Sequence, residues 1–312
     1  MRSRINQIDY LKCVFIILMV IFHLVYIGDK YPYAKQIVYT FHMPAFLVIS
    51  GYLVNVRKST THFFNTMLWI FIPYTVMELG YVLMSAILPV RESVSEITVY
   101  TLLNKIFISP LGPYWYLHTL IICSTTYYIL FRLFSFVKPV SLIILLGICL
   151  WGMDRFIGVL SFENAIYFII GIIFSLSGQN FLSFFKPSLF ALIPLAILCY
   201  YPINLDRFTL SGIIIVWLVI NVLIWLYDYL PQKIKSSSVF IGRNTLVILL
   251  FSPIFTILSK IFLPYLSFDK TGIIFMCISL ILVFGGCFFI AWCMDKMNLS
   301  RFFCGKTNII QL

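Results

Sequence analysis

Charged residues are scarce in this 312-residue chain. Asp, Glu, Lys and Arg together make up only 11%, whereas 62% of the residues are hydrophobic. Soluble domains carry about 25% charged residues, and a soluble core of this size could not bury so much apolar surface. The mean hydropathy of +1.01 leads to the same conclusion. The composition therefore excludes an ordinary soluble enzyme and predicts that a lipid bilayer surrounds most of the chain.

Several functional signatures are also missing. None of the eight cysteines forms a CxxC pair, and most lie in or beside apolar runs, so they are expected to be small apolar residues and neither disulfides nor metal ligands. No nucleotide-binding loop, redox motif or metal cluster is present, so no bound cofactor or metal is expected. No small-residue cleavage site follows the first apolar run, which predicts an uncleaved first span. No polar stretch is long enough for a second domain, so one membrane-embedded domain is expected over residues 1–312.

Apolar runs of spanning length, or close to it, recur along the chain. They predict an all-α, polytopic integral membrane protein with about 10 transmembrane helices. The longest outer loop, 90–113, contains SPLGP, which is typical of a turn. The expected spans are 8–27, 36–56, 66–89, 114–135, 139–154, 163–178, 187–203, 209–228, 243–263 and 271–294.

The net charge of +11 comes from 22 Lys and Arg against 11 Asp and Glu. No basic stripe with interleaved aromatic residues lies in a solvent-exposed segment, so nucleic acid is not an expected partner. An even number of spans puts both termini on one side. With the N-terminus inside, most of the basic residues fall in inner segments, as the positive-inside rule requires. Both termini are therefore expected in the cytoplasm, in a multi-pass protein of the inner (plasma) membrane.

Ionisable side chains inside spans are costly, so each is a candidate functional residue. Lys12 and His23 are eleven residues apart, which returns them to within about 20° of the same helix face and separates them by about 16 Å. Asp9 lies one turn before Lys12, where the two side chains can pair. The alternative for Lys12 is a lysine that extends to the membrane surface. The alternative for His23 is a buried histidine that is hydrogen-bonded to a neighbouring helix, or a histidine near the outer surface.

The second span ends in 41-FHMPAFLVISGYL-53. His42 lies at the outer end of this span, at a depth comparable to that of His23, so adjacent helices could bring the two imidazoles together. An interfacial histidine without chemistry is the alternative. Ser50 and Gly51 permit a close approach of a second helix.

Spans three and four contain three further candidate residues. Glu78 lies in the middle of the third span, where a carboxylate needs a partner or a raised pKa. A structural ion pair or a protonated glutamate is as compatible with this position as catalysis. Trp115 opens the fourth span at the outer interface, a usual place for aromatic belt residues. His118 follows one turn later and is expected to face the same outer chamber.

The pattern Asp9-x-x-Lys12, ten residues, His23, and then FHMPAFLVISGYL resembles the N-terminal signature of the membrane acyltransferase-3 family. Most family members carry arginine before the ten-residue spacer. The signature with Lys12 at this place and Asp9 before it resembles the branch of fucose 4-O-acetylases and polysaccharide O-acetyltransferases. Further agreements are IPY at 72–74, WYL at 115–117 and GRNTL at 242–246. Two features depart from the family pattern. Basic residues before IPY are missing, for which Arg57 and Lys58 are possible substitutes, and Ser252 stands in the region where a late histidine is common.

The resemblance implies transfer of an acyl group, usually acetyl, from cytoplasmic acyl-CoA to a hydroxyl of an extracytoplasmic glycan or lipid-linked saccharide. Acetyl-CoA would then be the cosubstrate. His23 would be the general base or a transient acyl carrier, assisted by His42, with Glu78 the weakest catalytic candidate. The implied donor-binding residues are Lys12, Asp9, Arg57 and Lys58, and the implied acceptor-side residues are Trp115 and His118.

Two other functions remain open at this point. A polysaccharide exporter or flippase would predict polar residues along a full aqueous path and pseudo-symmetric halves. Here the polar residues are concentrated in the first four spans, and no internal symmetry is visible, which favours an enzyme. A non-catalytic assembly component is the third possibility, in which His23 would matter only for stability.

Overall fold

The computed structural model describes residues 4–87, 94, 96–266 and 268–311. Every regular element in those ranges is a helix, which confirms the all-α prediction. The chain folds into two compact units. Unit 1 consists of Met1–Phe46, Leu182–Ser300 and Thr307–Leu312, and unit 2 of Leu47–Phe181 and Arg301–Lys306. Each unit is described by itself, and the expectation of a single functional domain stays a prediction.

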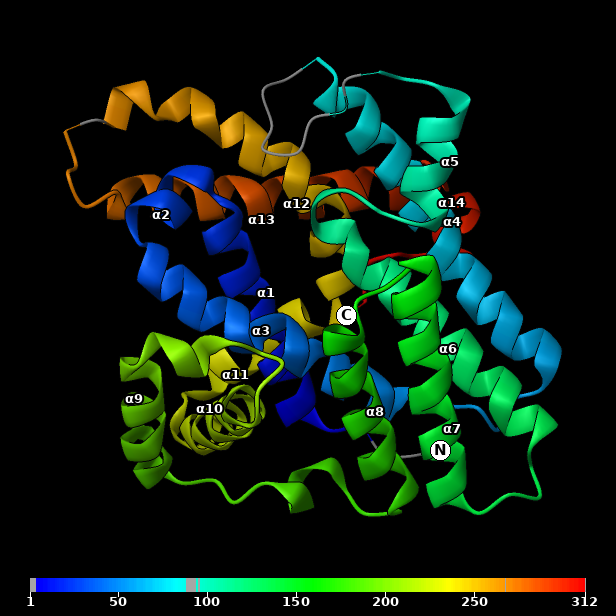
Figure 1. Cartoon of the computed structure of the whole chain (residues 1–312). Coiled ribbons are helices and arrows are strands. Elements are labelled where there is room, and N and C mark those ends of the chain that lie inside the picture. Colours follow the sequence, from blue (N-terminus) through cyan, green and yellow to red (C-terminus); the bar gives the residue numbers. More distant parts are fainter. Residues whose placement is uncertain (1–3, 88–93, 95, 267, 312) are drawn as a thin grey trace. The chain divides into compact units, whose positions relative to one another are not determined.

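Unit 1 is built around the first helix. In Figure 1, helix α11 packs against α1, and α12 packs along α13. Helix α3 begins in this unit and continues into unit 2. The elements are α1 (Asn6–His23), α2 (Val25–Lys30), α3 (Pro32–Leu53), η3 (Phe181–Phe184), η4 (Leu189–Ala191), α9 (Leu192–Tyr200), η5 (Pro202–Leu205), α10 (Leu210–Tyr229), α11 (Gln232–Arg243), α12 (Thr245–Leu258), η6 (Ser259–Phe262), η7 (Pro264–Leu266) and α13 (Ile273–Lys296).

Unit 2 contains the middle helices of the chain. Helix α6 contacts α4 and α7, and α7 contacts α8. The SPLGP segment lies between α5 and α6, and its last two residues begin the short helix η1. The elements are α4 (Thr60–Ser85), α5 (Val99–Phe107), η1 (Gly112–Tyr114), α6 (Trp115–Leu133), α7 (Pro139–Gly152), η2 (Met153–Ile157), α8 (Phe162–Leu176) and α14 (Ser300–Cys304).

Six helices of the described ranges are long and apolar enough to cross a bilayer: Asn6–His23, Thr60–Ser85, Pro139–Ile157, Leu210–Tyr229, Thr245–Phe262 and Ile273–Lys296. Val99–Phe107 and Gly112–Leu133, bent by 45°, make a seventh if they count as one span. The expected spans 163–178 and 187–203 correspond to the shorter apolar helices Phe162–Leu176 and Leu189–Tyr200. The count of ten and the side of the termini stay predictions.

Two expected segments reach beyond the described residues. The span expected at 66–89 is helix α4, and residues 88 and 89 lie outside the described ranges. Residues 90–93 and 95 of the expected outer loop lie outside them as well.

Helix α1 ends earlier than the expected boundary at residue 27. Leu24 adopts an extended backbone with ψ of 102°, while its N–H still donates to the carbonyls of Val20 and Ile21. Helix α2 then begins at Val25. His23 is therefore the last residue of α1, at the carbonyl end of the helix.

Two glycines of unit 2 bring α3 and α8 into backbone contact. A Cβ atom on Gly51 would lie 2.0 Å from the carbonyl oxygen of Phe168, and one on Gly171 would lie 2.1 Å from that of Val48. No side chain fits at either position. This contact confirms the close approach expected from the Ser50-Gly51 pair, and small residues at crossings are the usual means by which membrane helices associate.

Replacing Gly171 with Ala should lower the free energy of unfolding by about 1–3 kcal/mol, because the added methyl must push two backbones apart. The matched control is Gly147→Ala in α7, where a Cβ meets nothing within 4 Å. That substitution should be neutral or raise stability by up to about 1 kcal/mol, the helix-propensity gain of Ala over Gly. Thermal unfolding in detergent measures both. Equal effects of the two substitutions would contradict the close crossing.

Asp269 caps the start of α13. Its carboxylate accepts hydrogen bonds from the Thr271 hydroxyl (2.5 Å) and from the backbone N–H groups of Ile274 and Thr271 (both 2.8 Å). These bonds, with the Thr271 hydroxyl first, lower the pKa of Asp269 from 3.8 to about 2.

A depressed carboxyl pKa stabilises the fold above the unfolded-state value near 3.8, and this stabilisation disappears as the pH falls toward 2. The melting temperature of Asp269→Ala should therefore be lower than that of wild type at pH 7, and the difference should shrink between pH 4 and pH 2. Melting curves of the two proteins across this range provide the measurement. A difference that does not depend on pH would contradict the carboxylate cap.

Candidate functional site

His23 and His42 are held in the same way by their own helices. The Nδ1 atom of His23 lies 2.7 Å from the carbonyl oxygen of Met19, and that of His42 lies 2.7 Å from the carbonyl oxygen of Val38. A carbonyl oxygen only accepts, so each Nδ1 carries the proton. In the neutral ring, Nε2 then holds the lone pair. Both histidines are thereby set to act as bases through Nε2.

His42 is buried, with 3% of its surface exposed. Its Nε2 atom makes no hydrogen bond to any described residue. Leaving a buried polar atom without a partner costs about 1–3 kcal/mol, and such atoms in native structures require an explanation, of which catalysis is one. The His42 lone pair is therefore the strongest local indication of chemistry in unit 1.

Tyr39 joins the two histidines into one group. Its ring centroid lies 6.3 Å from that of His23 and 5.2 Å from that of His42. His42 also interacts electrostatically with His23 and with Arg207. The structure thus brings together the two histidines that the sequence placed at comparable depth, although their catalytic roles stay predictions.

Arg207 was not found from the sequence. It lies in a loop that is fixed to two helices: the Thr40 hydroxyl of α3 donates to the Leu205 carbonyl at 2.8 Å, and Gly212 of α10 lets the loop backbone pack closely. A Cβ on Gly212 would lie 2.4 Å from the carbonyl oxygen of Asp206. The proximity of Arg207 to His42 depends on the tertiary fold, so no local sequence pattern reveals it.

A second group of charges surrounds Asp9. Lys12 Nζ lies 2.7 Å from Asp9 Oδ1, while Arg4 Nε lies 2.8 Å and Arg243 Nε 3.9 Å from Asp9 Oδ2. The Asp9 side chain is 5% exposed, whereas those of Lys12, Arg243 and Arg4 are 19%, 27% and 51% exposed. The Asp9–Lys12 pair was expected. Arg4 and Arg243 join it, so three cations share one covered carboxylate.

The GRNTL segment explains how Arg243 reaches this place. A Cβ on Gly242 would lie 1.8 Å from the carbonyl oxygen of Asp9, so only glycine lets α11 touch α1 here. Asn244, two residues after Gly242, donates a hydrogen bond to the Gln311 carbonyl and accepts one from the Gln311 N–H. GRNTL was the only sequence signal for Arg243, and the signal did not reveal its partner.

Arg57 and Lys58 lie in unit 2, after the end of α3. The Arg57 N–H donates to Asn55 Oδ1 at 3.1 Å, and Lys58 Nζ lies 3.5 Å from the Thr66 hydroxyl. The Lys58 carbonyl accepts hydrogen bonds from Tyr128 and Arg132 of α6. Because Asp9 and Lys12 belong to unit 1, a donor site shared by all four residues stays a prediction.

Glu78 bonds to the segment that follows α5, and His118 bonds to the last residue of α5. Glu78 Oε1 accepts a hydrogen bond from the Leu111 N–H at 2.6 Å, and the residue is fully buried. His118 Nε2 donates to the Phe107 carbonyl at 3.0 Å. These bonds give both residues a structural role, and a catalytic role for Glu78 and an acceptor-side role for His118 stay predictions.

Trp115 begins α6, and its ring meets that of Tyr116 edge-on at 6.4 Å. The Tyr116 hydroxyl lies 2.7 Å from that of Ser50 on α3. Two segments of the sequence signature, WYL and ISGYL, are therefore in contact in unit 2. The acceptor-side role of Trp115 also stays a prediction.

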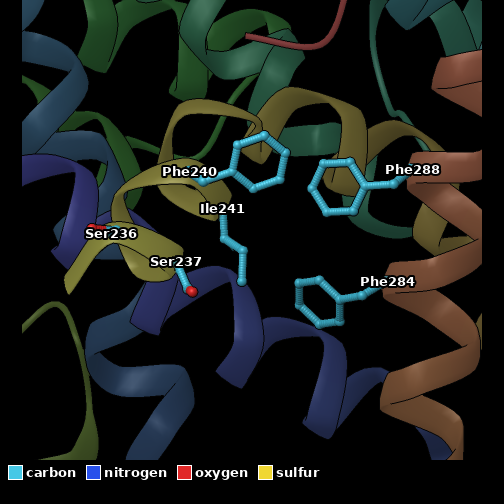
Figure 2. Close-up of a pocket in the computed structure, with 6 residues that line it drawn as sticks. All are labelled: Ser236, Ser237, Phe240, Ile241, Phe284 and Phe288. Atoms are coloured by element: carbon cyan, nitrogen blue, oxygen red, sulfur yellow. The ribbon is translucent and has the colours of Figure 1, made fainter. Parts of the chain in front are cut away.

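An open surface pocket of about 480 Å³ lies between α11 and α13. Figure 2 shows Phe240 and Phe288 facing each other, with ring centroids 5.2 Å apart, above Ile241 and Phe284. None of its lining residues is one of the candidate site residues. Its mainly apolar lining suits hydrocarbon and not a phosphate group.

Comparison with protein families supplies the class of the reaction. A family model described as an acyltransferase domain matches residues 5–292. The chain belongs to the acyltransferase-3 family. It is an acyltransferase, and its apolar helices make it a membrane protein. No curated protein and no solved structure matches the chain.

The hydrogen bond of Glu78 generates a prediction. Glu78→Ala should lower the free energy of unfolding by about 1–3 kcal/mol, because the buried Leu111 N–H loses its acceptor. Glu78→Gln should cost much less, since the amide oxygen still accepts. Thermal unfolding of both variants measures the effect. Equal destabilisation would contradict this role, and a loss of activity in a stable Glu78→Gln protein would assign chemistry to the carboxylate.

Proposed function

We propose that this acyltransferase moves an acetyl group from cytoplasmic acetyl-CoA to a hydroxyl of an extracytoplasmic glycan or lipid-linked saccharide, from within the plasma (inner) membrane. One observation carries the proposal. The single continuous helix α1 has the cations around Asp9 near one end and His23, with its Nε2 set as a base, at the other.

The spacing along α1 suits a CoA thioester. Lys12 and His23 are separated by about 16 Å of helix, which is comparable to an extended pantetheine arm. A cation suits a CoA phosphate at one end, and the thioester would then reach the histidines at the other. This supports a donor that lies along α1 with its head group at Lys12.

The transfer itself uses the lone pair of His23. Nε2 takes the proton of the acceptor hydroxyl while the hydroxyl oxygen attacks the thioester carbonyl carbon. The tetrahedral intermediate collapses, the C–S bond breaks, and the CoA thiolate leaves and takes the proton from the imidazolium. The products are the O-acetyl ester and CoA thiol. The partial negative charge at the carbonyl end of α1 stabilises the imidazolium that forms in between.

His42 assists from the acceptor side. Its buried Nε2 can accept a hydrogen bond from the acceptor sugar, which would orient the attacking hydroxyl toward His23. A covalent route would use the same atoms. Nε2 of His23 would attack the thioester carbonyl carbon, and the CoA thiolate would leave. The acceptor hydroxyl would then attack the acyl-imidazolium while His42 takes its proton, so that the N–acyl bond breaks and neutral His23 is released.

His23→Ala should lower acetyl transfer by about 10²- to 10⁴-fold, the usual contribution of a general base. The test is the O-acetyl content of surface glycans, by proton NMR, in a deletion strain that carries the wild-type or variant protein at matched membrane levels. His62→Ala is the control, because His62 is exposed and lies in α4 outside the histidine group. Equal acetylation by wild type and His23→Ala would overturn the mechanism. Polymer that accumulates inside the cell with unchanged acetylation would favour an exporter.

A further inference from the structure

The open pocket between α11 and α13 of unit 1 has a polar side and an apolar side. Ser236 and Ser237 line it from α11. Figure 2 shows the rings of Phe284 and Phe288 on the α13 side, with Ile241 of α11 between the serines and these rings. The volume of about 480 Å³ lies in the range of about 300–1,000 Å³ that small-molecule sites occupy. The pocket therefore has the size and the polarity that suit part of an amphiphile.

Helix α11 lies close to the first turns of α1. Gly242 of α11 packs against the backbone of Asp9. Lys235 of α11 lies over the ring of Tyr227, which contacts the ring of Tyr10 in α1. Because α1 is a spanning helix, its first turns lie near a membrane surface. The lysines and consecutive serines of α11 suit that interface and not the hydrocarbon core, so the pocket lies at the level of the lipid head groups.

The α13 side of the pocket faces hydrocarbon. Three large side chains of this spanning helix, Ile281, Phe289 and Trp292, are exposed, as contact with lipid requires. Trp292 lies one turn after Phe288, near the end of α13, and tryptophan is typical of the membrane interface. Phe284 and Phe288 therefore lie on the hydrocarbon side of that level, into which an acyl chain extends.

The α11 side of the pocket continues to a cation. Residues at positions i, i+3, i+4, i+7 and i+8 share one face of a helix. In α11 these positions hold Lys233, Ser236, Ser237, Phe240 and Ile241. Along this face the side chains change from a cation, through two hydroxyls, to apolar groups. A phospholipid presents its phosphate, its ester groups and its acyl chains in the same order.

The charge at the start of α11 favours an anion. Lys233 is exposed in the first turn of α11. Lys235 lies on a different face, where its Nζ donates to the carbonyl oxygen of Asp228 at 3.0 Å. Asp228 is the nearest acidic residue in the sequence, and the two lysines outnumber it, since neither α11 nor α12 contains Asp or Glu. Basic sites between helices at a membrane surface attract anionic lipid head groups.

We propose that the pocket between α11 and α13 binds a membrane phospholipid with an anionic head group. The Lys233 ammonium and the hydroxyls of Ser236 and Ser237 donate hydrogen bonds to the phosphate oxygens. One acyl chain lies in the pocket against Phe240, Ile241 and the two α13 rings. The site concerns a lipid of the surrounding membrane, so it does not depend on which donor and acceptor the acyl transfer uses.

Lipid titration of the purified, delipidated full-length protein, followed by native mass spectrometry, tests the head group. The two probes are phosphatidylglycerol and phosphatidylcholine with identical acyl chains. Wild type should bind phosphatidylglycerol more tightly. Lys233→Met should weaken phosphatidylglycerol binding by about fivefold, the usual contribution of one lysine at an anionic membrane surface, and leave phosphatidylcholine binding unchanged. Lys138→Met is the control, because Lys138 is also exposed and precedes a helix, α7, but lies in unit 2.

A phosphatidylglycerol with a photoreactive group in its acyl chain tests the position of that chain. Cross-links in the wild-type protein should concentrate on α11 and α13 at the residues that line the pocket. Ser237→Trp should remove most of them, because the indole occupies the pocket, while the exposed position leaves the melting temperature unchanged. Ser237→Ala is the matched control and should keep the cross-links.

Four outcomes would overturn the proposal. Equal affinity of wild type for the two lipids would remove the anionic head group, and equal losses in Lys233→Met and Lys138→Met would remove Lys233 from the site. Cross-links spread evenly over the exposed helices, or unchanged in Ser237→Trp, would remove the acyl chain from the pocket. Displacement of the lipid by soluble glycerol phosphate would indicate a site for a soluble phosphate compound instead.

Discussion

The rise of an α-helix fixes the geometry on which the proposed chemistry depends. Because α1 runs without a break from Asn6 to His23, Lys12 and His23 stand on one face about 16 Å apart. The bilayer favours an unbroken helix here, since backbone groups in lipid must form their hydrogen bonds within their own helix. The cation group and the histidine group are therefore two ends of one rigid element, and only a donor of matching length can engage both.

The lipid bilayer also determines how the two histidine side chains are held. His23 and His42 bond to the carbonyls of Met19 and Val38 in their own helices, and these bonds select the tautomer. The contacts between helices depend on small residues instead. Gly242 lets α11 reach the backbone of Asp9, so the charge group exists because a glycine stands one residue before Arg243.

Local periodicity in the sequence is enough to predict part of the histidine group, the charge group and the helix contacts. The shared face of Lys12 and His23, the Asp9–Lys12 pair and the close approach at Gly51 all follow from spacing within a helix or from residue size. The break at Leu24 did not, because neither proline nor glycine marks it. Arg4 and Arg243 could not be paired with Asp9 from the sequence, since Arg243 reaches Asp9 only through the tertiary fold. Glu78 gave a signal for chemistry, and its hydrogen-bonded partner is a backbone N–H that no side-chain pattern reveals.

The most direct test is transfer across a sealed membrane. The purified protein would be reconstituted in vesicles with labelled acetyl-CoA on the side of the N-terminus only and the glycan acceptor on the other side only. Wild type should place label on the acceptor, and His23→Ala should not, while both keep the vesicles sealed. Label transfer that proceeds equally well in the His23→Ala protein, or only when donor and acceptor share one side, would contradict a donor that lies along α1 with its thioester at His23.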